Sequence, residues 1–265
     1  MSDVNDEKVN AIDLFAGVGG STCGAKAAGA RVVAAVDAWG SACTSYRDNN
    51  PDTEVYSSFC EDVDPGGLEE QFGKIDLLLA SPECTSHTCA KGAAERSESS
   101  RGTAFQVVRF AEALNPRWIV VENVIHMRAW SRYQELIDSI KALGYCCVPQ
   151  VLNSADFGVP QSRRRLFIVC ERGQEPPEIV PPVRMKHVPV RDIIDTNGTY
   201  RYSPLRAEGR AAPTIERADR AMARGGSRNP FLIVYYGSDG SGGWQPVSRL
   251  LAFSPSSIST GPAIW

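Results

Sequence analysis

The sequence lacks several features that would assign it to whole classes of protein. No apolar run approaches the ~20 residues that a membrane-spanning helix requires, and the stretch MSDVNDEKVN at its start does not have the pattern of a signal peptide. No two of the 8 cysteines form a CxxC pair, which argues against a zinc ribbon, and no internal repeat is present. We therefore expect a cytoplasmic protein with reduced thiols, no membrane segment and no metal site.

A strong excess of charge of one sign is also absent. The formal net charge is −3, which argues neither for nor against a nucleic-acid partner. The charges are nevertheless distributed unevenly, because residues 1–75 hold 13 acidic and 5 basic side chains, whereas residues 184–228 hold 10 basic and 5 acidic ones. This asymmetry indicates that the later segment faces an anionic partner.

Short apolar runs alternate with helical patterns over the first two thirds of the chain. Such alternation is typical of a doubly wound α/β fold with a mostly parallel sheet. The expected strands cover residues 11–15, 31–37, 54–58, 75–79, 118–121, 146–152 and 165–170. The expected helices cover residues 21–28, a segment starting near 41, residues 103–114, and a segment for which Ser131 and Gln134 form a capping box.

The chain changes character near residue 175. Residues 171–190 are rich in proline, which marks a domain boundary or a linker. Beyond it the periodicity is poor, and short runs such as 231–236 are typical of β structure. We expect a first domain over residues 1–175 and a small, irregular, β-rich region over residues 176–265.

Cys84 follows one of the expected strands. The apolar run at residues 75–79 has the pattern of a buried parallel strand, and Ser81-Pro82 ends it, because proline cannot donate to the ladder. Cys84 therefore lies just past the carboxyl end of a central strand, where ligands and reacting groups gather in open α/β sheets. A single cysteine is more often a small buried apolar residue, so its neighbours decide its role.

Three further positions have the pattern of a nucleotide-type site. The glycine-rich stretch at 16–20 lies between a strand and a helix, so its backbone can approach a ligand closely, although a tight turn would give the same pattern. Asp37 ends the second strand and either accepts hydrogen bonds from ribose hydroxyls or caps the next helix. Asp62 either contacts an adenine amino group or lies in a solvated turn.

Four motifs occur together in one order. They are DLFAGVGG at 13–20, PEC at 82–84, ENV at 122–124 and QSRRR at 161–165. With these motifs, residues 9–170 resemble the DNA cytosine-5 methyltransferase family of bacterial or phage type. The resemblance implies a Rossmann-like catalytic domain over residues 1–175, S-adenosylmethionine as methyl donor, duplex DNA as substrate with the target base flipped out, and a target-recognition region over residues 176–265.

The resemblance also implies a role for individual residues. Cys84 is the thiolate that adds to C6 of cytosine, and Glu122 engages N3. Arg165, supported by Arg163, holds O2 of the base and helps to keep the thiol ionised. The donor-binding residues are Phe15, Gly17, Val18, Gly19, Gly20, Asp37, Ala38, Asp62, Val63 and Pro82.

The sequence departs from the family pattern in two places. The family has Pro-Cys-Gln where this chain has Pro-Glu-Cys, which leaves Cys89 as a rival thiol and Cys84, His87 and Cys89 as a weak zinc motif. The family's C-terminal motifs do not appear, so we expect that a missing C-terminal segment or a second chain completes the unit. The alternatives are an enzyme that acts on RNA or a free nucleotide, and a non-catalytic relative that binds DNA or a partner.

Overall fold

The computed structural model describes residues 8–83, 102–183, 185–189, 192–193 and 206–225. The chain divides into two compact units, which we describe separately. The first comprises residues 1–152 and 164–180, and the second comprises residues 153–163 and 181–265. This division assigns residues 153–163 to the second unit, which the expected boundary at residue 175 did not anticipate.

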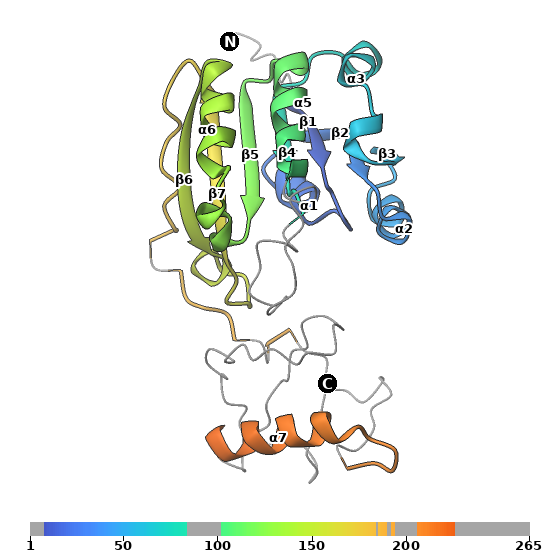
Figure 1. Cartoon of the computed structure of the whole chain (residues 1–265), viewed down its shortest axis with the longest axis vertical. Coiled ribbons are helices and arrows are strands. Elements are labelled where there is room, and N and C mark those ends of the chain that lie inside the picture. Colours follow the sequence, from blue (N-terminus) through green and yellow to red (C-terminus); the bar gives the residue numbers. More distant parts are fainter. Residues whose placement is uncertain (1–7, 84–101, 184, 190–191, 194–205, 226–265) are drawn as a thin grey trace, which may run out of the picture. The chain divides into compact units, whose positions relative to one another are not determined.

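The first unit is built on a seven-stranded sheet with strand order β3-β2-β1-β4-β5-β7-β6 (Figure 1). The strands are β1 (Asn10–Leu14), β2 (Arg31–Asp37), β3 (Glu54–Ser57), β4 (Leu77–Ala80), β5 (Trp118–Asn123), β6 (Tyr145–Asn153) and β7 (Arg164–Arg172). Strands β1 to β5 pair in parallel, and β7 pairs with β5 in the antiparallel direction. The predicted doubly wound, mostly parallel sheet is confirmed.

Helices cover both faces of this sheet. On one face α1 (Gly20–Ala27) and α2 (Gly40–Asn49) pack against β1, β2 and β3. On the other face lie α3 (Pro65–Phe72), α5 (Gln106–Leu114) and α6 (Tyr133–Ala142), of which α5 and α6 stand in front of the sheet in Figure 1. Short 3-10 turns complete the first unit, namely η1 (Cys60–Asp62), η3 (Thr103–Phe105) and η4 (Ile125–Ala129), whereas η5 (Ser154–Phe157) belongs to the second unit.

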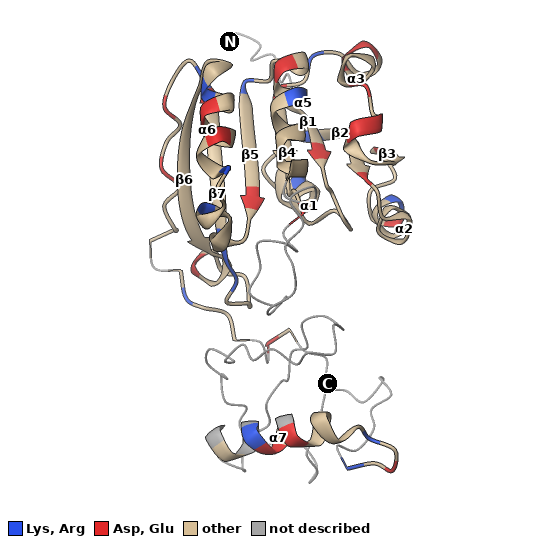
Figure 2. Cartoon of the chain, in the orientation of Figure 1, with Lys and Arg blue, Asp and Glu red and all other residues tan. Residues whose placement is uncertain are grey.

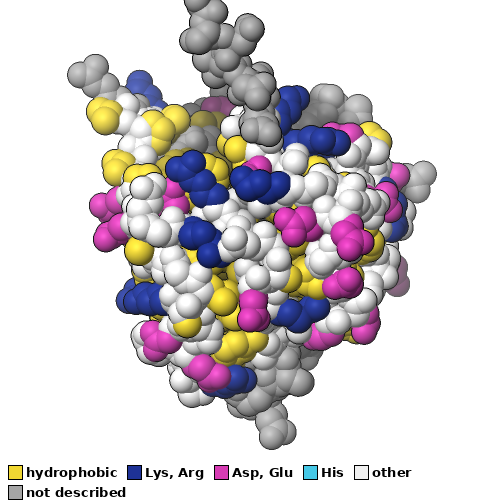
Figure 3. Space-filling model, turned by 90° about the horizontal axis from the view of Figure 1, so that it is seen from above, with side chains coloured by type: hydrophobic (Ala, Val, Ile, Leu, Met, Phe, Trp, Pro, Cys, Tyr) yellow, Lys and Arg dark blue, Asp and Glu magenta, His cyan; other side chains and the backbone are white. Residues whose placement is uncertain are grey.

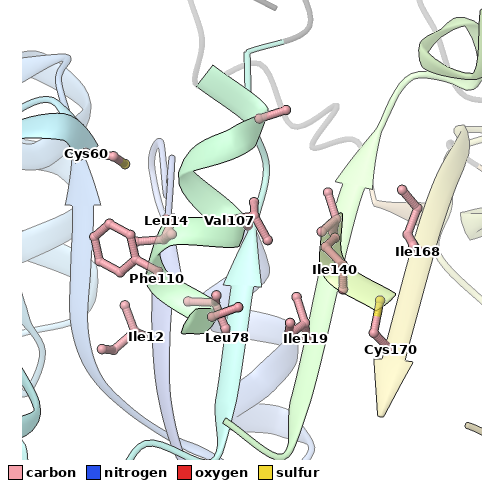
Figure 4. Packing of buried hydrophobic residues seen from close by; sticks show 14 of the residues in the cluster. Ile12, Leu14, Cys60, Leu78, Val107, Phe110, Ile119, Ile140, Ile168 and Cys170 are labelled. Carbon is pink, nitrogen blue, oxygen red and sulfur yellow. The ribbon is translucent and has the colours of Figure 1, made fainter. Parts of the chain in front are cut away.

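The main core lies between the sheet and α5 and α6 (Figure 4). Helix α5 buries one face because its apolar residues recur at helical spacing, and these residues are Val107, Phe110, Ala111 and Leu114. They pack against strand residues such as Ile12, Leu78 and Ile119, all of which are fully buried. Burial of each large side chain contributes about 1.5–3 kcal/mol, so this layer fixes the sheet on which the site is built.

One local prediction is wrong, and one helix was not expected. No side chain caps α6 by a hydrogen bond, and the helix begins at Tyr133 with Arg132 as its N-cap residue, so Ser131 and Gln134 form no capping box. The side chain of Gln134 instead donates to Asp138 at 2.8 Å, one turn further along the helix.

In the described part of the second unit, residues 212–225 form the helix α7 (Ala212–Gly225), which the expectation of a β-rich region missed. The run at 231–236 lies outside the described residues.

Charged residues of the first unit lie mainly on the helices and at the ends of the strands (Figure 2). Figure 3 shows one face of the molecule, on which acidic and basic side chains alternate with neutral and apolar ones. The described side chains on this face form no patch of a single sign. Charge therefore does not distinguish this face as a binding surface.

Candidate active site

The carboxyl ends of the parallel strands meet at one edge of the sheet. The register pairs Leu14 with Val36 and with Ala80, and it pairs Ala80 with Val121. The loops that follow β1, β2, β4 and β5 therefore leave the sheet side by side. Ligands bind at this edge in open α/β sheets. It carries predicted site residues after each of these four strands, namely the glycine-rich loop, Asp37, Pro82 and Glu122.

The loop after β1 is held against the end of β2 by a carboxylate. Phe15 and Gly17 both have positive φ, at 57° and 54°, so the chain turns sharply before α1 begins. The backbone N–H of Gly17 donates to Asp37 Oδ2 at 2.8 Å, and the N–H of Trp39 donates to Asp37 Oδ1 at 2.8 Å. Asp37 thus fixes the loop and keeps lone pairs on both oxygens for a ligand. Val18 and Ala38, beside these residues, are exposed.

Gly19 and Gly20 join this loop to α1. Gly19 has φ 96°, and a Cβ atom there would lie 2.9 Å from the side-chain nitrogen of Asn50 and 3.1 Å from the ring of Tyr46. Any larger residue at Gly19 would therefore push the loop away from α2. Gly20 is exposed, with open space around its Cα, so a ligand can reach the backbone at the start of α1.

A buried polar network lies beneath the glycine-rich loop. Thr22 Oγ1 donates to Asp13 Oδ2 at 2.8 Å and lies 2.5 Å from the hydroxyl of Tyr46. Since the single hydroxyl proton of Thr22 goes to Asp13, the Tyr46 hydroxyl donates to Thr22. Asp13 Oδ1 is buried and has no hydrogen-bond partner among the residues that the structure describes. The network connects β1, α1 and α2 directly below the loop.

Burial dominates the titration of this network. Removal of Asp13 from water raises the pKa of its carboxyl to about 6, against the opposing effect of the Thr22 hydrogen bond. Burial likewise raises the pKa of Tyr46 to about 12, so the hydroxyl stays a donor at neutral pH. Ionisation of the Asp13 carboxyl therefore costs free energy in the folded chain.

The turn after β3 presents Asp62 to solvent. Asp62 is exposed, whereas Cys60 and Val63 on either side of it are buried at 2% and 7% exposure. Two large aromatic side chains at the same edge are also exposed, Trp39 at 68% and Phe59 at 65%. An exposed acid and exposed aromatic side chains at one edge of the sheet suit a flat, hydrogen-bonding ring system such as adenine.

The end of β4 is anchored to the end of β5. Asn123 is 2% exposed, and its side-chain amide donates to the carbonyl of Pro82 at 3.1 Å. The amide oxygen accepts from the N–H of Val124 at 2.8 Å. Pro82 is buried, so this bond fixes the backbone two residues before Cys84.

Glu122 and Arg165 form an ion pair at this edge. Arg165 Nε lies 3.0 Å from Glu122 Oε1, and each side chain is 24% exposed. The pair forms because β7 runs antiparallel to β5, with Phe167 opposite Glu122, so the start of β7 comes level with the end of β5. Both members stay accessible to a ligand from solvent.

The structure describes only part of the predicted catalytic set. Cys84, His87 and Cys89 lie outside the described residues. Arg163 is exposed and belongs to the second unit, where its carbonyl accepts from the N–H of Ser154 at 3.1 Å. The donor-site residues of the glycine-rich loop, together with Asp37 and Pro82, line one edge of the sheet, and Glu122 and Arg165 stand beside them.

Sequence reasoning missed four side chains that support this site. Asp13, Thr22 and Tyr46 form the buried network, and Asn123 anchors Pro82. Asp13 begins the DLFAGVGG motif and Asn123 lies within the ENV motif, whereas no sequence signal pointed to Thr22 or Tyr46.

The described residues contain neither a metal-binding cluster nor a membrane-spanning helix. No group of three or more His, Cys, Asp or Glu side chains among them could hold a metal ion. None of the helices in that part of the chain is long and apolar enough to cross a membrane.

The family model of the C-5 cytosine-specific DNA methylases matches residues 9–206, which is more than half of the chain. The matched span contains the glycine-rich loop, the Asn123–Pro82 anchor and the Glu122–Arg165 pair. The chain belongs to the C-5 cytosine-specific DNA methylase family.

Individual relatives agree with this assignment. The Type II methyltransferase M.DdeI of Desulfomicrobium norvegicum is 32% identical over 176 residues, which cover 63% of this chain and 42% of M.DdeI. The Type II methyltransferase M.AquIA of Picosynechococcus is 34% identical over 177 residues, which cover 61% of this chain and 71% of M.AquIA. The Dnmt2 methyltransferase of S. pombe has the same fold, with a TM-score of 0.60 and 16% identity over 86% of this chain and 68% of its own. The chain spans less than half the length of M.DdeI.

Proposed function

We propose that this chain transfers a methyl group from S-adenosylmethionine to C5 of cytosine in DNA. The observation that carries the proposal is the Glu122–Arg165 ion pair of 3.0 Å at the edge where β4 leads to Cys84. The anchored carbonyl of Pro82 supports it, because it fixes the backbone that approaches the thiol. Family membership and the bacterial origin of the relatives favour action on DNA in a bacterial or phage-infected cytoplasm, within a restriction-modification system.

The residues at the sheet edge fit the donor. Asp37 keeps lone pairs for ribose hydroxyls, Asp62 is exposed at the same sheet edge as the exposed Trp39 and Phe59, and the open backbone at Gly20 accepts the amino-acid end of the donor. When bound, the donor supplies an electrophilic methyl group. We assign Phe15, Val18, Ala38, Val63 and Pro82 to the walls of this site.

The chemistry requires a nucleophile and an acid on opposite sides of the base. C5 of cytosine is a weak nucleophile until a thiolate adds to C6, which places electron density at C5. We propose that Cys84 supplies the thiolate and that Glu122 hydrogen-bonds or protonates N3, so that the ring accommodates this charge. After C5 has accepted the methyl group, a base removes the C5 proton and the thiolate leaves C6, which restores the enzyme and the aromatic ring.

Arg165 acts on both the Glu122 carboxylate and the cytosine base. Its guanidinium fixes the Glu122 carboxylate through Nε, and we propose that its other N–H groups reach the base O2. A cation near the thiol also favours the thiolate over the thiol. We propose that Arg163 supports Arg165 in this role, and that the second unit reads the DNA.

Covalent trapping tests this proposal. The purified chain is incubated with S-adenosylmethionine and a duplex that contains 5-fluorocytosine, whose C5 fluorine cannot be removed as a proton, and the products are separated on a denaturing gel. We expect a covalent protein–DNA species with the wild type and none with Cys84→Ser, because a hydroxyl is far less ionised than a thiol near neutral pH. The matched control Cys89→Ser should retain the adduct.

The same assay separates the alternatives. An adduct that depends on Cys89 would overturn the assignment of the nucleophile. Transfer of labelled methyl groups to RNA or free cytidine, but not to duplex DNA, would overturn DNA as the substrate. Donor binding without an adduct would favour a non-catalytic relative, or an enzyme that requires a second chain or a missing C-terminal segment, and addition of that component would separate those two cases.

A further inference from the structure

Arg109 connects α5 to the turn that carries Asp62. Its Nη2 donates to the carbonyl oxygens of both Cys60 and Val63, at 3.1 Å for Val63. Its Nε donates to Gln106 Oε1 at 2.7 Å, within its own helix. One guanidinium thus holds both ends of the η1 turn from a helix that lies more than forty residues further along the chain.

The position of this turn depends on that contact. Cys60 and Val63 are buried, and both hydrogen bonds from Arg109 are partly buried, so loss of the guanidinium leaves two carbonyls that water only partly compensates. Figure 4 shows Cys60 in the same layer of packed side chains as Phe110, over whose ring the Arg109 guanidinium carbon lies at 4.8 Å. The guanidinium is planar and rigid, so it fixes the direction of both carbonyls as well as their distance. Asp62 lies between these two held residues and is exposed.

We propose that Arg109 is a positioning residue for the methyl donor, which it serves by holding the η1 turn so that Asp62 meets the adenine amino group. This inference rests on the donor role proposed above for Asp62. Arg109 touches neither the base nor the reacting methyl group. Its loss should therefore weaken donor binding while turnover at saturating donor stays within about twofold.

A double-mutant cycle tests the inference. The dissociation constants of S-adenosylmethionine and S-adenosylhomocysteine are measured by calorimetry for the wild-type chain, Asp62→Asn, Arg109→Gln and the double variant. We expect each single change to weaken binding by about tenfold, which is typical of a lost charge-assisted hydrogen bond. In the Asp62→Asn background, Arg109→Gln should add less than about twofold, because the residue that Arg109 positions is already disabled.

Two further variants exclude a general loss of structure. Arg117→Gln is the matched control, because the Arg117 guanidinium also stacks on an aromatic ring, 4.1 Å from the centroid of Trp118, and also donates to a buried partner, Glu171. It should leave donor affinity unchanged. Arg109→Lys keeps the charge and one donor, so it should bind donor more tightly than Arg109→Gln, and it replaces that variant in the cycle if Arg109→Gln does not fold.

The outcomes separate this inference from the proposed function. Additive effects of Asp62→Asn and Arg109→Gln would overturn the positioning role while Asp62 keeps its place in the donor site. Unchanged donor binding in Asp62→Asn would overturn both the role of Asp62 and the inference. In either case the covalent adduct with 5-fluorocytosine still tests methyl transfer by itself.

Discussion

The side-chain amide of Asn123 donates to the carbonyl of Pro82 across 3.1 Å, and this bond fastens the end of β4 to the end of β5. Replacement by alanine leaves a buried carbonyl without its partner and frees the backbone two residues before Cys84. We expect Asn123→Ala to reduce the single-turnover methylation rate by about tenfold or more, and to reduce the free energy of unfolding by about 1–3 kcal/mol. Donor affinity should change by less than about threefold.

The control for this prediction is Asn49→Ala. The Asn49 amide also donates to a backbone carbonyl, that of Ser45 at 2.8 Å, but it does so at the exposed surface of α2. This variant should keep both the rate and the stability of the wild type. Equal rates for Asn123→Ala and Asn49→Ala would remove Asn123 from the support of the site.

The pair of Glu122 and Arg165 gives a second prediction. Glu122→Gln keeps the shape of the side chain but cannot deliver a proton to N3, so we expect the methylation rate to fall by ~10²–10⁴-fold with donor binding retained. Glu171→Gln is the matched control, because Glu171 also pairs with an arginine, Arg117, at 3.0 Å beside the same two strands. That variant should lose stability and keep its rate. A loss below tenfold in Glu122→Gln would contradict a role in proton transfer.

Much of the first unit was predictable because its signals are local. Strand β2 was predicted with its observed bounds, since a run of β-branched and small apolar residues ends in Asp37. The apolar face of α5 likewise follows from helical spacing in the sequence. Three of the four motifs could be assigned to one edge because they follow parallel strands, whose carboxyl ends must meet there. The QSRRR motif instead lies at the start of β7, and the antiparallel direction of β7 brings Arg165 to the same edge.

The supporting contacts were not predictable because they join residues far apart in the chain. Thr22 and Tyr46 are 24 residues apart, and Arg109 and Cys60 are 49 apart, and no local pattern indicates that they meet. Helix α7 was missed although its apolar and charged residues segregate at helical spacing as clearly as those of α5, so its sequence did carry a helical signal. The capping box failed because α6 begins two residues after Ser131.

Asp13 provides a prediction about pH. Burial raises the pKa of its carboxyl from 3.8 in water to about 6 in the folded chain, so the folded state binds the proton more tightly than the unfolded state. The stability that the protonated group contributes is therefore complete below pH 3.8 and is lost as the pH rises through 6. A shift of this size corresponds to roughly 3 kcal/mol. Asp13→Asn does not titrate, so its free energy of unfolding should rise relative to that of the wild type by about this amount between pH 4 and pH 7.

Urea unfolding of both proteins across this pH range measures the difference directly. Asp52→Asn is a control of opposite sign, because the hydrogen bond from Lys26 lowers the pKa of the exposed Asp52 carboxyl. The contribution of Asp52 should therefore stay nearly constant between pH 4 and pH 7 and fade only as the pH falls below its ordinary pKa of 3.8. A constant difference between Asp13→Asn and the wild type over the whole range would show that Asp13 does not bind its proton as its burial requires.

The last prediction concerns the arginines of α7. Positions 217, 220 and 224 recur at spacings of three and four residues, so they share one side of the helix, and Arg220 is exposed and lies 3.6 Å from Glu216. If this side follows a DNA backbone, each arginine that binds a phosphate releases counterions. Replacement of all three by alanine should then weaken duplex binding and reduce the slope of log K against log salt by roughly 0.9 for each phosphate that is no longer neutralised.

Fluorescence anisotropy at several salt concentrations measures that slope, and Arg132→Ala on α6, which removes another exposed and paired arginine, should leave it unchanged. Donor affinity should also stay constant in the triple variant, since these positions lie in the second unit and the donor residues lie in the first. A fall in donor affinity with an unchanged salt slope would mean that α7 supports the catalytic unit and does not bind DNA.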